Sequence, residues 1–172
     1  MKNPPKQQRV RSNGVKRGSL FADGSMQLKP SAPEAFESIN VDDYLTILAI
    51  IANADAVLRT EELAFFESRM ARMLINPNMR SKFRQLLKME FDIDAVARKI
   101  DKRTLRLALR DGIFLAAADG EIHPAEVDVV RIIAHHAEVD EERLHEIWSW
   151  VKEGITWMAQ GPRLTEVPLH DK

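Results

Sequence analysis

Apolar residues follow a helical pattern from residue 40 almost to residue 160. They recur every three or four positions, as in Leu45, Leu48 and Ile51, with polar residues between them. This spacing predicts helices at 41–52, 60–75, 79–90, 92–99 and 101–116, a sixth that begins at Pro124, and a seventh at 141–158. No segment alternates apolar and polar residues over the length of a strand. We therefore predict an all-α fold of about seven helices.

Capping residues support several of these boundaries. Asn40 and Asp140 each precede a helical run, where a short polar side chain accepts hydrogen bonds from the first free N–H groups of a helix. Thr60 is a similar candidate for the start of the second helix. Pro124 suits the first position of the sixth helix, because the N–H that proline lacks would be unpaired there.

One segment of the chain occurs twice without a gap. The first copy, residues 54–62, reads ADAVLRTEE, and the second, residues 118–126, reads ADGEIHPAE. Each copy has an aspartate at the end of an apolar run and a glutamate seven positions later. An internal repeat of this kind predicts two helix–loop–helix units that pack together, because each is too small to bury its own apolar face. We therefore predict a compact bundle built from two pseudo-symmetric repeats.

The second copy resembles half of a calcium-binding loop. Asp119, Gly120 and Glu126 match the acid, the glycine and the final glutamate of an EF-hand. The first and third positions of such a loop should supply oxygen ligands, but here they are Leu115 and Ala117. One copy alone therefore has too few oxygen ligands to hold calcium.

Two copies packed about a pseudo-two-fold axis would bring four carboxylates together, namely those of Asp55, Glu62, Asp119 and Glu126. Four carboxylates suit a hard divalent cation such as calcium or magnesium, and His123 is the histidine best placed to join them. A structural role explains the same residues. The glutamates lie in the first turn of a helix, where an acid stabilises the helix dipole, and the aspartates can close each loop onto backbone N–H groups. Both interpretations remain open.

Composition limits the class of protein. The chain has 172 residues, of which 45% are apolar, so it can form one globular core. It contains no cysteine, which excludes disulfides, thiol catalysis and thiolate metal sites. No apolar run reaches the ~18–20 residues of a membrane span, and the N-terminus lacks the apolar stretch of a secretory signal. We expect a cytoplasmic protein.

The composition also divides the chain into three parts. Residues 1–38 are rich in proline, glycine and serine, and residues 1–22 hold six basic residues and no acid. We predict a disordered basic arm at 1–38, a helical domain at 39–160 and a loose tail at 161–172. The arm is either a solubilising tail or an electrostatic contact for nucleic acid, an anionic membrane or the acidic domain itself. Nucleic acid ranks last, because Phe21 is the one aromatic residue near the basic positions.

Catalytic motifs are absent from the sequence. The five histidines include no HExxH pair, and no glycine-rich phosphate loop or nucleophile elbow is present. We predict that the protein is not an enzyme and has no catalytic residues.

The last predicted helix has two faces of interest. A stripe of apolar residues should face the core: Leu144, Ile147, Trp148, Val151, Ile155 and Met158. Trp150 and Trp157 are seven residues apart and share a different face. This second face either packs against another helix or is an exposed patch for a protein partner or a membrane interface, where tryptophan is enriched.

The second repeat, followed by the apolar pattern of residues 127–134, resembles the TerB-like family, which includes tellurite-resistance proteins and the N-terminal domain of the co-chaperone DjlA. The resemblance covers about residues 40–158 and is weaker in the first repeat, where Ala56 replaces the glycine. It implies a compact helical bundle of two related halves. It also implies a metal-binding role for Asp119 and Glu126 and, through the repeat, for Asp55 and Glu62. Family members are proposed to be interaction modules in stress responses, often at the inner face of the membrane.

Two functional hypotheses follow. The first is a non-enzymatic, tellurite-resistance-type domain that binds a divalent cation through the paired acids of its two repeats. The second is a metal-independent adaptor that contacts a protein partner, or a membrane peripherally, through the Trp150 and Trp157 face and the basic arm.

Overall fold

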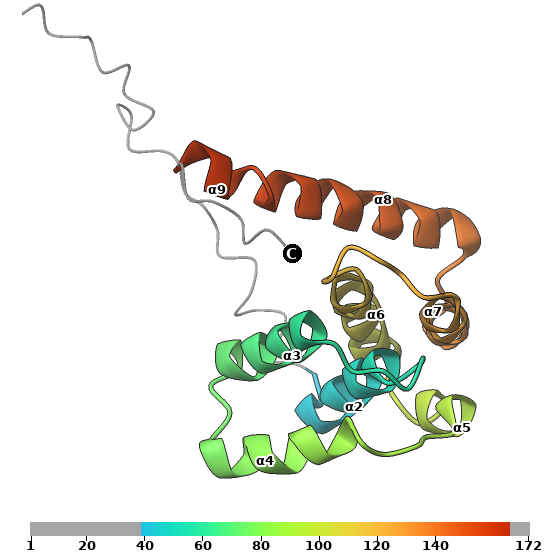
Figure 1. Ribbon diagram of the computed structural model, residues 1–172. Helices are drawn as coiled ribbons and strands as arrows, with labels where there is room; N and C mark the ends of the chain where they lie inside the picture. The colour runs from blue at the N-terminus through green and yellow to red at the C-terminus, as the bar shows by residue number, and fades with distance from the viewer. Residues whose placement is uncertain (1–38, 166–172) are drawn as a thin grey trace, which may run out of the picture. The chain divides into compact units, whose positions relative to one another are not determined.

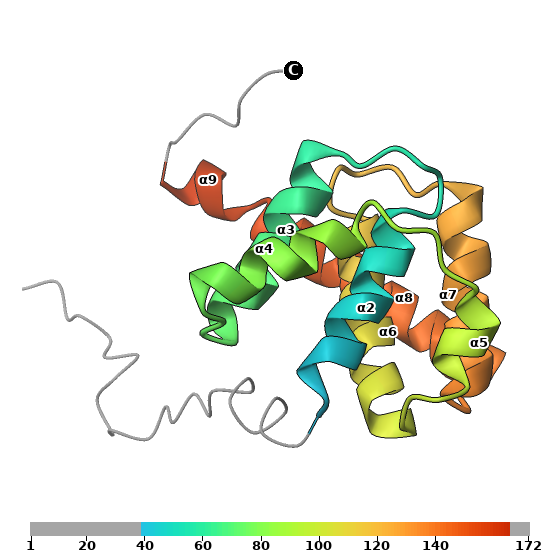
Figure 2. The ribbon, with the colours of Figure 1, turned by 90° about the horizontal axis from the view of Figure 1, so that it is seen from below.

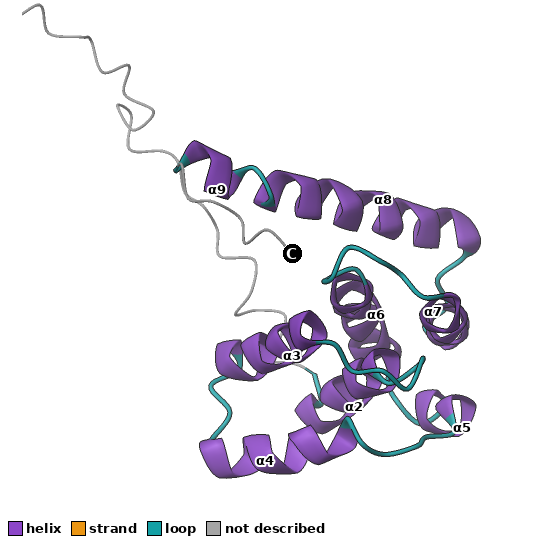
Figure 3. Ribbon diagram, in the orientation of Figure 1, coloured by secondary structure: helices purple, strands orange, loops and turns teal. Residues whose placement is uncertain are grey.

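A computed structural model describes residues 39–165, and within them the chain forms helices joined by loops (Figures 1 and 3). The helices are α2 (Val41–Ala52), α3 (Thr60–Arg72), α4 (Pro77–Leu86), α5 (Ile93–Ala97), α6 (Lys102–Ala116), α7 (Pro124–His136), α8 (Glu141–Met158) and α9 (Gly161–Leu164). No strand occurs in this range, so the predicted all-α fold is confirmed for it. The predicted basic arm at 1–38 and residues 166–172 of the predicted tail lie outside the described residues.

The core is built around α2 and α6, which lie against each other in both ribbon views (Figures 1 and 2). From Tyr44 onward, α2 is buried at all but one position, as expected for a helix that is apolar on every side. Gly112 of α6 allows the close approach: a Cβ atom at this position would lie 2.1 Å from Cδ1 of Ile51. Other helices pack on this pair, with α3 and α7 on both, α4 on α2 and α8 on α6, while α5 packs on α7.

One buried carboxylate joins three helices inside this core. Asp111 of α6 is fully buried and accepts a hydrogen bond from the Tyr44 hydroxyl of α2 at 2.7 Å. Arg110 donates to the same carboxylate through Nε at 2.8 Å, and Arg69 of α3 pairs with it at 3.4 Å. Burial and the adjacent Asp111 raise the pKa of Tyr44 above its ordinary value, so the hydroxyl keeps its proton and remains a donor.

Several predicted helix boundaries are confirmed. Asn40 accepts hydrogen bonds from the N–H groups of Asp42 and Asp43, and Asp140 caps α8 by accepting one from Arg143. Pro124 is the first residue of α7. The predicted cap at Thr60 is wrong, because Thr60 is already helical and Arg59 occupies the capping position.

The predicted end of the second helix at Ile75 is also wrong. The helix α3 ends at Arg72 because Leu74 adopts a left-handed conformation, with φ 54°. The Ile75 N–H then donates to the Met70 carbonyl and closes the helix end. The next two helices are shorter than predicted, and Pro77 begins α4 rather than lying in the preceding loop.

The structure also differs from the predictions at the C-terminal end of the domain. Residues Gly161–Leu164 form the short helix α9 where no periodic structure was predicted. Met158 was expected in the core but is 53% exposed, because it is the last residue of α8 and this end of the helix extends past α6 (Figure 1). Of the helices in the described range, none is long and apolar enough to cross a membrane.

Replacement of Gly112 by alanine tests the central contact. The added methyl group must displace the Ile51 side chain inside a packed core, and we expect the free energy of unfolding to fall by about 1–3 kcal/mol. Gly161→Ala is the control, since a Cβ atom there has no neighbour within 4 Å. Chemical denaturation of both variants gives the comparison, and equal stabilities would show that α2 and α6 do not depend on this glycine.

Candidate functional site

The two acidic loops lie next to each other at one end of the α2–α6 pair. One loop joins α2 to α3 and the other joins α6 to α7 (Figure 2). Arg59 connects them directly. Its Nη1 lies 2.9 Å from Asp55 Oδ2 in its own loop, and its Nε lies 2.8 Å from Asp119 Oδ2 in the other. The two aspartates singled out by the repeat are therefore brought together by an arginine that sequence reasoning did not identify.

Each aspartate also closes its own loop. Asp55 Oδ1 accepts a hydrogen bond from the Val57 N–H, and Asp119 Oδ1 accepts one from the Glu121 N–H, both at 2.9 Å. Burial alone would raise the pKa of Asp55, but the Val57 N–H and the Arg59 guanidinium outweigh it, so this pKa lies below its ordinary value. Both aspartates thus make the loop-closing contacts expected of a structural role.

The two loops share the same backbone conformation despite the missing glycine in the first. Ala56 has φ 61° and Gly120 has φ 89°, so both residues are left-handed. The match extends to the ends of the following helices, where Leu74 and Glu138 have φ values of 54° and 52°. Each pair is separated by the 64 positions of the sequence repeat. These local matches agree with two related units, and the pseudo-two-fold arrangement of whole halves stays a prediction.

The two glutamates lie inside the protein. Glu62 and Glu126 are each 1% exposed, and each occupies the third position of its helix, α3 and α7. Glu62 Oε2 accepts a hydrogen bond from the Arg59 N–H at 2.8 Å, and Glu126 Oε2 accepts one from the His123 N–H at 2.7 Å. Both residues therefore satisfy free backbone donors at a helix start, as in a capping box.

The remaining oxygen atoms of these glutamates have too few hydrogen-bond donors. Glu126 Oε1 is buried and receives no hydrogen bond from a donor N–H or O–H of the described residues, while the neighbouring side chain is another carboxyl group, that of Glu62. Two carboxylates cannot hydrogen-bond unless one of them holds a proton. Burial and the adjacent Glu126 raise the pKa of Glu62 to about 7, so below this pH the pair holds a proton that can join the two carboxyl groups. The site thus carries more buried negative charge than its protein donors neutralise.

The other candidate ligand, His123, has a structural contact. Its Nδ1 accepts a hydrogen bond from the Ala125 N–H at 3.2 Å at the start of α7, and the residue is exposed. Among the described residues, no three histidine, aspartate or glutamate side chains are arranged to hold a metal ion as they lie. The position that a cation would take between Asp55 and Asp119 is held by the Arg59 guanidinium.

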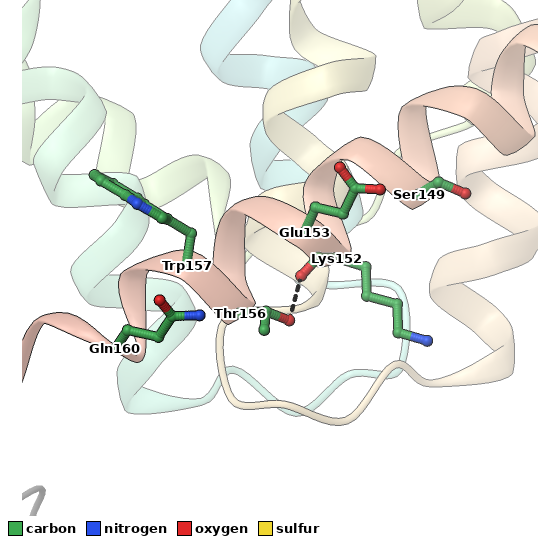
Figure 4. Close-up of a pocket in the computed structure, with 6 residues that line it drawn as sticks. All are labelled: Ser149, Lys152, Glu153, Thr156, Trp157 and Gln160. Carbon is green, nitrogen blue, oxygen red and sulfur yellow. Dashed lines mark hydrogen bonds between the residues drawn. The ribbon is translucent and has the colours of Figure 1, made fainter. Parts of the chain in front are cut away.

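The tryptophans predicted to share a face lie on the outside of α8. Trp150 is 53% exposed and Trp157 is 74% exposed. The Trp150 ring meets Phe114 of α6 edge-on, with ring centroids 5.3 Å apart. Figure 4 shows Trp157 projecting from the helix, while the Thr156 hydroxyl turns back and donates to the Lys152 carbonyl at 2.8 Å. Trp150 is thus held in place by one ring contact, and most of the Trp157 side chain meets solvent.

The buried glutamate pair should make stability depend on pH. The pKa of Glu62 rises from an ordinary value of 4.5 to about 7 on folding, so the folded protein binds more protons than the unfolded chain between these values. The free energy of unfolding should therefore fall as pH rises through this window. Glu62→Gln removes the titration and offers Glu126 Oε1 an N–H donor, so this variant should be more stable than the parent near pH 8.

Thermal unfolding measured between about pH 5 and about pH 8 checks this expectation. Glu121→Gln, which removes an exposed acid from the loop between α6 and α7, is the control and should leave the slope unchanged. A parent protein whose stability does not fall over this window would contradict a protonated Glu62.

Comparison with known proteins identifies the family of this chain. The family model described as tellurite resistance protein TerB matches residues 42–148, which is more than half of the chain and includes both acidic loops. No curated protein and no solved structure gives a match. The matched region confirms the predicted resemblance, and the chain belongs to the TerB family.

Proposed function

We propose that this TerB-family domain binds a divalent cation, calcium or magnesium, at the junction of its two acidic loops. The proposal is a non-enzymatic, tellurite-resistance-type role in which Asp55, Glu62, Asp119 and Glu126 supply the oxygen ligands. The observation that carries it is the buried Glu126 Oε1, which lies beside a second buried carboxyl group and lacks a hydrogen-bond donor whenever Glu62 is ionised. A polar atom in this position is costly unless something neutralises it.

The charge balance of the loops favours a cation. Four carboxyl groups lie around one arginine, so full ionisation would leave three uncompensated negative charges. In the absence of a cation, a proton on Glu62 relieves part of this excess. A hard divalent ion would replace that proton and give Glu126 Oε1 a partner, and oxygen ligands of this kind are the ones calcium and magnesium take.

Arg59 sets the condition for binding. Its guanidinium already pairs with Asp55 and Asp119, so a cation must compete with it for both carboxylates. The Arg59 side chain is 28% exposed, so its guanidinium can move outward into solvent, and the cation would then neutralise the two aspartates that it leaves. We propose that Arg59 closes the site when no cation is present and leaves it when one binds.

Thermal unfolding in chelator, and then with calcium or magnesium added separately, tests the proposal. A cation that binds only the folded protein adds about 2.7 kcal/mol at 100 times its dissociation constant, and we expect a rise of roughly several degrees in Tm. The rise should be larger near pH 8 than near pH 6, because the cation displaces the Glu62 proton.

Two matched variants identify the site. Asp119→Asn keeps the oxygen that closes the loop but loses the charge, so the cation-dependent rise should disappear. Asp128→Asn removes an exposed acid from α7, and its rise should equal that of the parent. Absence of a rise with either ion, or an equal rise in both variants, would leave the four acids with a purely structural role.

The exposed tryptophans favour a second candidate function, a metal-independent adaptor that contacts a protein partner. A side chain as large as Trp157, exposed by 74%, is enriched at protein interfaces. The predicted contribution of the basic arm falls outside the described residues.

An alanine substitution separates partner binding from packing for this face. Trp157→Ala should change the free energy of unfolding by less than about 0.5 kcal/mol, because the side chain buries little surface. Denaturation of the variant in chelator gives the measurement, with Val151→Ala as a buried control on the same helix. A loss as large as that of the control would show that Trp157 packs against the domain and is not free for a partner.

A further inference from the structure

We propose that the described domain carries a second binding site, for a phosphate monoester attached to an aromatic ring. The site is an open pocket of about 470 Å³ between α6 and α8, away from the four acids. It is lined by Arg106, Arg110, Arg143, Glu146, Ile147 and Trp150. The inference is independent of cation binding.

The sequence spacing explains why these side chains meet. Arg106 and Arg110 are four residues apart and share one face of α6. Arg143, Ile147 and Trp150 follow at four and seven residues on α8, which packs against α6. Three arginines from two helices therefore line one pocket together with an indole ring.

Each arginine is anchored by hydrogen bonds, and two of the three retain free terminal nitrogens. Arg106 donates through Nε to the Ala137 carbonyl at 2.9 Å and through Nη2 to the Glu138 carbonyl at 3.5 Å. Arg110 Nε donates to Asp111 at 2.8 Å. Arg143 Nη1 donates to Glu146 at 2.6 Å. A guanidinium has five N–H donors, so within the described residues both terminal nitrogens of Arg110 and one of Arg143 remain available. Anchored arginines with free terminal nitrogens suit bidentate contact with phosphate oxygens.

The charge of the pocket matches a phosphate monoester. Three arginines face one carboxylate, that of Glu146, while the Asp111 carboxylate behind Arg110 is shared with Arg69. The pocket therefore has a net charge of about +2, and a phosphate monoester carries about −1.5 to −2 near pH 7. This positive site lies in a domain whose described residues hold more acids than bases, 21 against 17. A single carboxylate would leave part of the positive charge unpaired.

The indole ring of Trp150 is the reason why the proposed ligand contains an aromatic ring as well as a phosphate. Phe114 packs against Trp150 in a T-shaped contact, with an interplanar angle of 83°, and so holds the ring from one side. Since the residue remains 53% exposed, an aromatic ring can stack on it while an attached phosphate reaches the arginines. Ile147 supplies further apolar surface next to the indole.

Titration of the full chain with phenyl phosphate in chelator, followed by calorimetry, tests the proposal. We expect Arg143→Gln and Arg110→Gln each to weaken binding by about tenfold, the usual loss for one charged hydrogen-bonding group. Arg131→Gln removes the same charge from the exposed face of α7, outside the pocket, and should leave the affinity unchanged. The Arg143 side chain is exposed and, among residues 39–165, forms an ion pair only with Glu146, so its variant should retain the fold.

A second comparison isolates the ring. Trp150→Ala should weaken phenyl phosphate but not inorganic phosphate, whereas Trp157→Ala should affect neither. Binding that survives Arg110→Gln and Arg143→Gln would come from elsewhere, such as the basic residues at 1–22, and would overturn the proposal. Failure of phenyl phosphate to bind the parent protein, or an equal loss in Arg131→Gln, would overturn it as well.

Discussion

Arg59 lies between Asp55 and Asp119, and through these two contacts the loop that follows α2 is joined to the loop that follows α6. Without a positive charge at this point, two acidic loops could not lie side by side, because like charges in a partly buried setting repel strongly. The same contact holds the starts of α3 and α7 close to each other, and this places Glu62 against Glu126. The geometry of all four acids therefore depends on one side chain.

The α2–α6 contact supplies the framework on which this arrangement rests. Gly112 lets the two helices approach closely, and Asp111 next to it links α6 to α2 and α3. Because α6 runs from the arginine pocket to the second acidic loop, one helix positions groups of opposite charge at different places on the domain. Positive and negative sites can then coexist in a small protein, since their separation allows solvent and salt to screen them from each other.

The sequence predicted the elements well, because their signals are local. Helical spacing, the caps at Asn40 and Asp140 and the position of Pro124 depend only on neighbouring residues. The end of α3 could not be predicted in this way, since a left-handed leucine such as Leu74 is unusual and no glycine marks the position. Met158 was assigned to the core from its spacing on α8, but its exposure depends on how far this helix extends past its neighbours.

The candidate site was predicted in part, and the missing part has a physical explanation. Comparison of the two repeats identifies residues that match, such as Asp55 with Asp119 and Glu62 with Glu126. Arg59 does not match, because its counterpart is His123, so a search for shared residues passes over it. Its spacing from Asp55, four residues along the chain, was an available signal for one ion pair but not for the second one across to Asp119.

This difference between the loops also bears on how the site works. His123 caps its own helix with Nδ1, whereas Arg59 extends to both aspartates, so one loop supplies the positive charge for two. A second arginine at the His123 position would add another positive charge beside the aspartates and so weaken the electrostatic attraction for a cation. With a single arginine, the buried glutamates keep an excess of negative charge that a proton on Glu62 relieves only below about pH 7. The asymmetry of an otherwise repeated pair of loops is thus what leaves the site able to take up positive charge from solution.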